Sequence, residues 1–249
     1  MGGKVIGKEL IELGSVDSTN KEAAELLALS QAVHGTVILA HRQTDGRGQR
    51  GRSWTSSAGL DLTLSIVLMP RKLKASEQFG LAKVAALAVQ EVVQARVRNE
   101  TRIKWPNDVL VDRRKIAGIL IKNEVLGGLV QNAIVGIGLN VNSKELDEAY
   151  LPTSLLLETG KEHDRKALLD VLLETFERRW EQWEQGDPAI ATDYSALLWA
   201  KGRWSPFELD GKPITARPVD VDADGRLIVE TQDGVVAAYG LERLRSAAR

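Results

Sequence analysis

The sequence predicts an α+β protein with a large domain over residues 1–201 and a small β-rich domain over residues 202–249. The large domain mixes strand-like apolar runs with segments whose apolar residues recur at helical spacing. After about residue 202 the helical spacing stops, and three Asp-Gly pairs separate short β-rich runs. A chain of 249 residues with 43% hydrophobic content can bury one large core together with a small module.

Runs rich in β-branched and other apolar residues predict the strands of the large domain. The expected strands cover residues 10–13, 36–42, 61–69, 102–105, 109–111, 116–121 and 133–139. A turn at Asp112-Arg113-Arg114 joins two of these strands as a hairpin, and Gly127-Gly128 turns the chain into the last one.

Three other segments have the apolar spacing of amphipathic helices. They cover residues 21–29, 77–96 and 165–185. Ser18 or Thr19 is expected to cap the first helix, and Ser76 is expected to cap the second.

The small domain is predicted to be a meander of β-hairpins, because an Asp-Gly pair between β-rich runs is a strong hairpin signal. The runs cover residues 213–221, 226–230 and 235–239. A meander of this length predicts a small barrel appended to the large domain.

The basic and acidic side chains nearly cancel, with 33 Lys and Arg against 34 Asp and Glu. A general attraction to nucleic acid is therefore not expected, and any basic character must be local. The absence of cysteine excludes disulfides, thiolate metal sites and a cysteine nucleophile, and it favours a reducing compartment. No apolar stretch is long enough for a signal peptide or a membrane span. These features predict a cytoplasmic protein that does not associate with membranes.

The most distinctive segment is residues 46–54, Gly-Arg-Gly-Gln-Arg-Gly-Arg-Ser-Trp, which we call the Gly/Arg loop. Its letters match the G-x-G-x-x-G pattern of dinucleotide-binding proteins, but that pattern needs a helix directly after the glycines, and another strand follows here. Kinase glycine-rich loops do lie between strands, yet the kinase sequences D-F-G and H-R-D are missing. Glycine allows close backbone approach and arginine supplies fixed positive charge, so we expect a mobile cover over an anionic ligand.

A second cluster is Lys104-Trp105-Pro106-Asn107-Asp108, which Lys115 follows on the next strand. Pro106 interrupts the strand, so Asn107 and Asp108 are expected at a loop tip with their side chains free. The hairpin would return Lys115 towards Asp108. An acid beside a lysine can orient that lysine, coordinate Mg²⁺ or assist proton transfer. The alternative is an Asx-turn with a solvated lysine, and the spacing does not choose between them.

A third cluster, residues 136–142, ends a strand with two glycines and two amides. Asn140 could read a base or ribose edge by hydrogen bonding, and a plain exit from the strand is the alternative. The three histidines are scattered without metal-ligand spacing, which argues against a zinc site. A G-x-S-x-G nucleophile elbow is also missing. The sequence therefore identifies no metal ligands.

Taken together, these clusters resemble those of the biotin–protein ligases, which are biotin–[biotin carboxyl carrier protein] ligases. The shared elements are Ser18-Thr19-Asn20, Gln43, the Gly/Arg loop, residues 104–108, Lys115-x-x-Gly118-Ile119-Leu120 and Gly136-x-Gly138-x-Asn140. The resemblance is specific from about residue 10 to residue 142 and weaker beyond. It implies a mixed β-sheet with helices, related to class II aminoacyl-tRNA synthetases and lipoate ligases, followed by a C-terminal SH3-like barrel.

The activity implied by the resemblance has two steps. Biotin and ATP give biotinyl-5′-AMP and pyrophosphate, and a lysine of a biotin carboxyl carrier protein domain then attacks the adenylate. ATP, biotin and Mg²⁺ would be required. One alternative is a lipoate or octanoate ligase of the same superfamily, but the Gly/Arg loop and residues 104–108 favour biotin. Another is a non-catalytic protein that binds biotin or biotinyl-AMP, against which Arg47, Asp108 and Lys115 argue.

The resemblance also implies roles for individual residues. The catalytic residues would be Arg47, Lys115 and Asp108. Biotin would contact Ser18, Thr19, Asn20, Gln43, Gly46, Arg47, Gly48, Lys115 and Gly118. ATP or the adenylate would contact Arg50, Arg52, Trp54, Asn107, Lys115 and Asn140. Closure of the Gly/Arg loop would keep water away from the reactive mixed anhydride.

Two positions depart from the family pattern. Gln49 stands where arginine is common, which predicts a faster release of biotinyl-AMP, and Lys122 stands where an acid is frequent. The first catalytic strand begins near residue 9, which predicts a monofunctional ligase that binds no DNA. Members of the family often dimerise through sheet edges, and the sequence is compatible with a homodimer.

Overall fold

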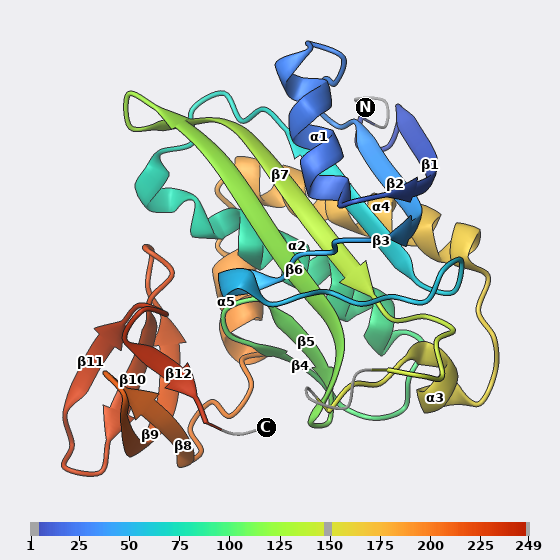
Figure 1. Ribbon diagram of the computed structural model, residues 1–249. Coiled ribbons are helices and arrows are strands. Elements are labelled where there is room, and N and C mark those ends of the chain that lie inside the picture. The colour runs from blue at the N-terminus through green and yellow to red at the C-terminus, as the bar shows by residue number, and fades with distance from the viewer. Residues whose placement is uncertain (1–4, 147–150, 248–249) are drawn as a thin grey trace.

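The computed structural model describes residues 5–146 and 151–247, and its centre is a seven-stranded sheet (Figure 1). Its strand order is β1-β2-β3-β7-β6-β5-β4. The strands are β1 (Leu10–Val16), β2 (Val37–Gln43), β3 (Leu62–Leu68), β4 (Thr101–Lys104), β5 (Asp108–Val111), β6 (Arg114–Leu126) and β7 (Leu129–Leu139). β1 and β2 are parallel, and every other neighbouring pair is antiparallel. The sheet is therefore mixed, and each strand expected in the large domain is present.

The central strands are apolar throughout because both faces of the sheet are covered and successive side chains point to opposite faces. Every residue of β3 is buried. Ile66 and Leu68 belong to the large core cluster, whereas Val67 joins a smaller cluster that includes Ala23 of helix α1 (Thr19–Ala28). Figure 1 shows α1 on one side of the sheet and helices α2 and α4 on the other.

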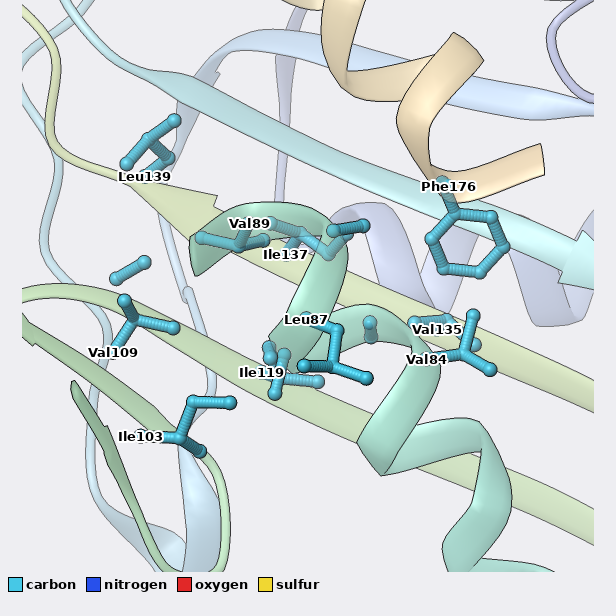
Figure 2. Packing of buried hydrophobic residues seen from close by; sticks show 14 of the residues in the cluster. Val84, Leu87, Val89, Ile103, Val109, Ile119, Val135, Ile137, Leu139 and Phe176 are labelled. Carbon is cyan, nitrogen blue, oxygen red and sulfur yellow. The ribbon is translucent and has the colours of Figure 1, made fainter. Parts of the chain in front are cut away.

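Helices α2 (Phe79–Gln94), α4 (Arg165–Glu184) and α5 (Ala189–Ala196) cover the side that holds the large core. Figure 2 shows side chains of α2, among them Val84 and Leu87, packed towards the sheet, with Phe176 of α4 above them. This packing accounts for the broad apolar stripe of the second predicted helix.

The prediction that Ser76 caps α2 is wrong. Ser76 lies in a 3-10 turn, η2 (Ala75–Glu77), and α2 begins after Gln78, whose side chain forms no cap hydrogen bond. Helix α4, in contrast, begins after Asp164, whose carboxylate accepts hydrogen bonds from two backbone N–H groups. Helices α3 (Leu155–Thr159) and α5 were not predicted, because helices of five and eight residues show too few turns for a clear apolar period.

The C-terminal strands form a five-stranded antiparallel sheet in the order β11-β10-β9-β8-β12. They are β8 (Ser205–Leu209), β9 (Lys212–Val221), β10 (Leu227–Thr231), β11 (Val236–Tyr239) and β12 (Leu244–Ser246). Asp210 and Gly211 have φ angles of 50° and 80°, which is the geometry of the predicted Asp-Gly hairpin. Among the described residues no ladder joins β11 to β12, so the hydrogen-bond pattern is that of an open sheet.

The small sheet is packed onto the rest of the protein through a shared core. Phe207 and Val229 of the small sheet belong to the same apolar cluster as Leu87 of α2. Within residues 5–146 and 151–247, no helix combines the length and apolar character needed to cross a membrane.

Candidate active site

A cavity of about 410 Å³ lies where the sequence clusters converge. The predicted site residues that line it are Ser18, Thr19, Asn20, Gln43, Arg47, Gly48, Arg50, Arg52, Trp54, Asn107, Asp108, Lys115, Gly118 and Asn140. Gly46 is the exception. Its carbonyl accepts a hydrogen bond from the backbone N–H of Trp54 at 2.8 Å, so Gly46 shapes the Gly/Arg loop and does not line the cavity.

One end of the cavity is lined by three uncharged side chains, Thr19, Asn20 and Gln43. The buried hydroxyl of Ser65 lies behind them and is bonded to two of them, and we call the four residues the hydroxyl–amide cluster. Thr19 donates its backbone N–H to Gln43 Oε1 at 2.8 Å. Ser65 Oγ lies 2.8 Å from Thr19 Oγ1 and 2.6 Å from Asn20 Oδ1. Asn20 Nδ2 donates to the carbonyl of Leu120 at 3.0 Å. These bonds join the start of α1, the end of β2 and the middle of β3 and β6, and they hold the cluster in place.

Ser65 was not among the predicted site residues, although its hydroxyl donates a hydrogen bond to the predicted residue Asn20. The signal available was the hydroxyls of Thr63 and Ser65 within a strand that is otherwise apolar, since polar groups in a buried strand need partners. Ser18 does occupy the N-cap position of α1, as predicted, but its side chain forms no cap hydrogen bond and lines the cavity.

The glycines of β7 make room for the cavity's polar and aromatic walls. A Cβ atom on Gly136 would lie 2.4 Å from Asn20 Oδ1, and one on Gly138 would lie 2.2 Å from Trp54 Cε2. Trp54 therefore packs against bare backbone, and Lys115 Nζ lies 5.5 Å from the centroid of its ring. This close approach is the physical reason for the glycine pattern at the end of β7.

The Gly/Arg loop folds back on itself beside the cavity. The backbone N–H of Gly48 donates to the carbonyl of Arg52 at 2.7 Å, and Arg50 at the tip has a φ of 56°. The guanidinium of Arg47 is bonded to Asp45 at 2.5 Å, and both side chains are more than half exposed. The loop thus presents its arginines near the cavity from a solvated position, as expected of a cover.

Lys115 and Asp108 form an ion pair in the cavity wall, with Nζ and Oδ1 2.7 Å apart. The two residues are close because Asp108 opens β5 and Lys115 lies near the start of β6. The prediction that the hairpin returns Lys115 to Asp108 is confirmed, and the alternative of a solvated lysine is wrong. The expectation of free side chains at a loop tip is also wrong, because Asn107 Nδ2 donates to the carbonyl of Ile119 at 2.8 Å.

Asn140 is buried and has one polar atom available for a ligand. Its Nδ2 donates to the carbonyl of Thr153 at 2.9 Å, whereas its Oδ1 is buried without a hydrogen-bond partner in the described structure. A buried acceptor of this kind is costly unless a donor reaches it. Asn142, in contrast, is bonded to the backbone of His163 and has a structural role.

Several cavity residues had no predicted role. Lys104 lines the wall, and burial lowers the pKa of its ammonium, while the nearby Asp108 opposes that shift. Leu241, Arg245 and Ser246 reach the cavity from the small sheet. No local pattern marks these three residues, because only the packing of the small sheet brings them to the site.

The sequence profile of the Biotin/lipoate A/B protein ligase family matches residues 13–140. The chain is 38% identical over 223 residues to a biotin--[acetyl-CoA-carboxylase] ligase of Paracoccus denitrificans, and the match covers 86% of this chain and 87% of the relative. It is 32% identical over 244 residues to the ligase of the same name from Mycobacterium tuberculosis, with 96% of this chain and 90% of the relative covered.

Solved structures agree with these sequence matches. A biotin protein ligase from Aquifex aeolicus in complex with biotin and ATP matches with a TM-score of 0.80 and 29% identity. The match covers 96% of this chain and 100% of that chain. With its fold, its cavity and these matches in agreement, the chain belongs to the Biotin/lipoate A/B protein ligase family.

Proposed function

We propose that this protein is an ATP-dependent biotin–protein ligase. The observation that carries the proposal is a single cavity with the uncharged hydroxyl–amide cluster at one end and the Lys115–Asp108 ion pair in its wall, beside the Gly/Arg loop. The relatives named as biotin ligases and the likeness to a biotin- and ATP-bound ligase support it.

The first step would join two anions. A carboxylate oxygen of biotin attacks the α-phosphorus of ATP, and the bond to pyrophosphate breaks. Lys115 would offset the charge repulsion, because its side chain is only 22% exposed and its Nζ lies 2.7 Å from Asp108 Oδ1. Arg47, Arg50 and Arg52 would add positive charge when the Gly/Arg loop lies over the ligand.

The second step would transfer biotin to a protein lysine. The ε-amine of a lysine on a biotin carboxyl carrier protein domain attacks the acyl carbon, an amide bond forms and AMP leaves. Asp108 would orient Lys115 and the incoming amine, and it can accept the proton that the amine loses. Lys115 would stay close to the acyl and phosphate oxygens throughout.

Uncharged groups suit the ureido head of biotin. Gln43 accepts from Thr19 with Oε1, which leaves Nε2 to donate to the ureido oxygen. Ser18, Thr19 and the backbone of Arg47 would bond the rest of the head, with Asn20, Gly48 and Gly118 completing the biotin contacts.

At the other end of the cavity, Asn140 Oδ1 would accept a hydrogen bond from the exocyclic amine of adenine. Trp54 would line the adenylate, and Asn107 would help to bind it.

Mg²⁺ would be held mainly by the phosphates of ATP. Among the described residues, no group of three or more His, Cys, Asp or Glu side chains could hold a metal ion. Asp108 is the carboxylate in the described cavity wall, and one carboxylate with substrate phosphates is a common way to hold Mg²⁺. The ion would neutralise phosphate charge during the first step.

The wider assignments belong to the same proposal. We place the boundary between the catalytic domain and the C-terminal domain at residues 201 and 202, and we propose that the five-stranded sheet is an SH3-like module. The protein would act in the cytoplasm on a biotin-dependent carboxylase. A homodimer would use the open sheet edge at β1, and sedimentation velocity would detect it.

The proposal is tested by biotin-dependent exchange between ATP and labelled pyrophosphate, followed by labelling of a carrier domain. Exchange with biotin and transfer to the carrier lysine are expected. Exchange with lipoate or octanoate in place of biotin would show a different acyl specificity. Binding of biotin without exchange would show a non-catalytic binding protein.

A further inference from the structure

A buried hydrogen bond joins the Lys104–Asp108 segment to the small sheet. Trp105 Nε1 donates to the carbonyl of Gly225 at 2.8 Å, across 120 residues of sequence. Trp105 is 8% exposed, and Gly225 lies in the turn between β9 and β10. A buried bond of this kind costs more to break than a solvated one, because the indole N–H would lose its acceptor.

The turn at Gly225 also packs closely against Phe79. Gly225 has a φ of +82°, and a Cβ atom there would lie 2.4 Å from Phe79 Cδ2 at the start of α2. The ring of Phe79 packs edge-on against Tyr194 of α5, with centroids 5.9 Å apart. Phe79 is thus backed by a buried ring and cannot yield freely. We call Trp105, Gly225 and Phe79 the interdomain latch.

A partly buried lysine lies beside the latch. Lys83 of α2 lies 5.9 Å from the ring centroid of Phe79 and 5.8 Å from that of Tyr194. Burial lowers the pKa of Lys83, and the carboxylates of Asp220 and Asp222 oppose that shift electrostatically. Lys83 thus lies over the same ring, Phe79, that limits the turn at Gly225.

The seating of the small sheet matters because that sheet supplies part of the cavity wall. Leu241, Arg245 and Ser246 line the cavity. β12 is an edge strand whose ladder pairs it with β8, so a ladder to the large sheet does not position it. The position of Arg245 therefore follows from how the whole small sheet is held.

The latch lies at the end of the cavity opposite to the hydroxyl–amide cluster. The hydroxyl–amide cluster is carried by α1, β2 and β3, at the β1 side of the large sheet. Trp105 follows β4, next to Asp108 of β5, at the opposite side of the strand order. Figure 1 shows α1 and the small sheet at opposite ends of the molecule. The small sheet thus borders the part of the cavity that lies away from the hydroxyl–amide cluster, where the proposed function places ATP.

We propose that the interdomain latch positions Leu241 and Arg245 at the nucleotide end of the cavity, so that binding of ATP depends on the latch and binding of biotin does not. The proposal rests on the proposed function. The ring of Trp105 also lines the cavity, but its indole N–H is bonded to the small sheet, and it is through this bond that Trp105 acts as a positioning residue.

Two variants open the latch from its two sides. Trp105→Phe keeps an aromatic ring but removes the N–H donor, and Gly225→Ala drives the turn away from Phe79. Gly234→Ala is the matched control, because Gly234 has a φ of +83° in the same sheet with nothing within 4 Å of an added Cβ. All three variants can be compared by thermal unfolding before activity is measured.

In biotin-dependent pyrophosphate exchange, we expect Trp105→Phe and Gly225→Ala to raise KM for ATP by about tenfold, the loss that one hydrogen bond of this kind supports. The Kd for biotin without ATP should stay within about twofold of wild type. Gly234→Ala should leave KM for ATP unchanged. The double variant Trp105→Phe/Gly225→Ala should be no weaker for ATP than the weaker single variant, because both break one contact.

The two proposals fail in different ways. An active wild type whose latch variants match Gly234→Ala, or weaken biotin and ATP equally, contradicts the latch alone. A wild type without biotin-dependent exchange contradicts the proposed function and the latch with it. If Gly225→Ala does not fold, Trp105→Phe still decides the question.

Discussion

Lys115 Nζ lies 2.7 Å from Asp108 Oδ1, and the two side chains are 22% and 23% exposed. The pair spans the β5–β6 hairpin at the wall of the cavity, with the ring of Trp54 close to the ammonium. A charge held in this partly buried position acts more strongly on a neighbouring anion than a solvated one. The pair is therefore the best single target for testing the proposed chemistry.

Lys115→Ala is expected to lower the rate of pyrophosphate exchange by about 10²–10³-fold, because it removes the cation nearest the developing charge. The fold should survive, since the side chain is at the cavity wall and not in the core. Lys122→Ala on the same strand is the control, because Lys122 is exposed and lies outside the cavity. Exchange that falls equally in both variants would contradict the assigned role.

Asp108→Asn should separate the two steps of the reaction. The amide keeps the size of the side chain but cannot accept the proton of the incoming amine. We expect single-turnover transfer from preformed biotinyl-AMP to a carrier lysine to fall by about tenfold or more, and exchange to fall by less. A larger effect on exchange than on transfer would assign Asp108 to the first step.

Substitutions of the two glycines of β7 are expected to impair the binding of different substrates. Gly136→Ala would push on Asn20 Oδ1, 2.4 Å from the added Cβ, and should raise the Kd for biotin. Gly138→Ala would displace Trp54, 2.2 Å from the added Cβ, and should weaken ATP binding and retention of the adenylate. Calorimetric titration with biotin, and exchange at varied ATP, measure the two effects. Identical defects in both variants would mean that the two ends of the cavity are not separate.

Gln49 predicts weak retention of the intermediate. It lies at the start of the turn η1 (Gln49–Gly51) and lines the cavity, where arginine would place a charge near the adenylate. Gln49→Arg should slow the release of labelled biotinyl-AMP in a pulse-chase experiment, and Gln49→Ala should not. Equal release rates for wild type and Gln49→Arg would exclude a role for this position.

The lowered pKa of Lys104 leads us to expect that ATP binding depends on pH. Burial lowers the pKa of its ammonium below the ordinary value of 10.5, so Lys104 loses its charge at a lower pH than an exposed lysine. Bound polyphosphate favours the charged form, and KM for ATP should therefore rise as the pH increases through this lowered pKa. Lys104→Arg keeps its charge and should shift that rise to higher pH. An unchanged pH profile would show that Lys104 does not contact the nucleotide.

The helical and strand periods predicted most of the large domain because they record which face of each element is buried, and burial of apolar faces drives folding. The predictions that were wrong concern single side chains whose hydrogen bonds the sequence does not show. Ser76 resembles a cap, but a 3-10 turn intervenes before α2. Asn107 resembles a free loop residue, but its amide bonds to the carbonyl of Ile119.

By itself, the sequence determined the order of the strands and long helices of the large domain, the family and most of the residues that meet at the cavity, because these motifs lie in short segments with local chemical character. Only the tertiary structure decided that Ser65 joins the hydroxyl–amide cluster and that Asn140 keeps a buried acceptor without a partner. It alone brought Arg245 to the cavity and Trp105 to Gly225. These relationships join segments far apart in the chain, and side-chain packing between layers sets them, which no local period encodes.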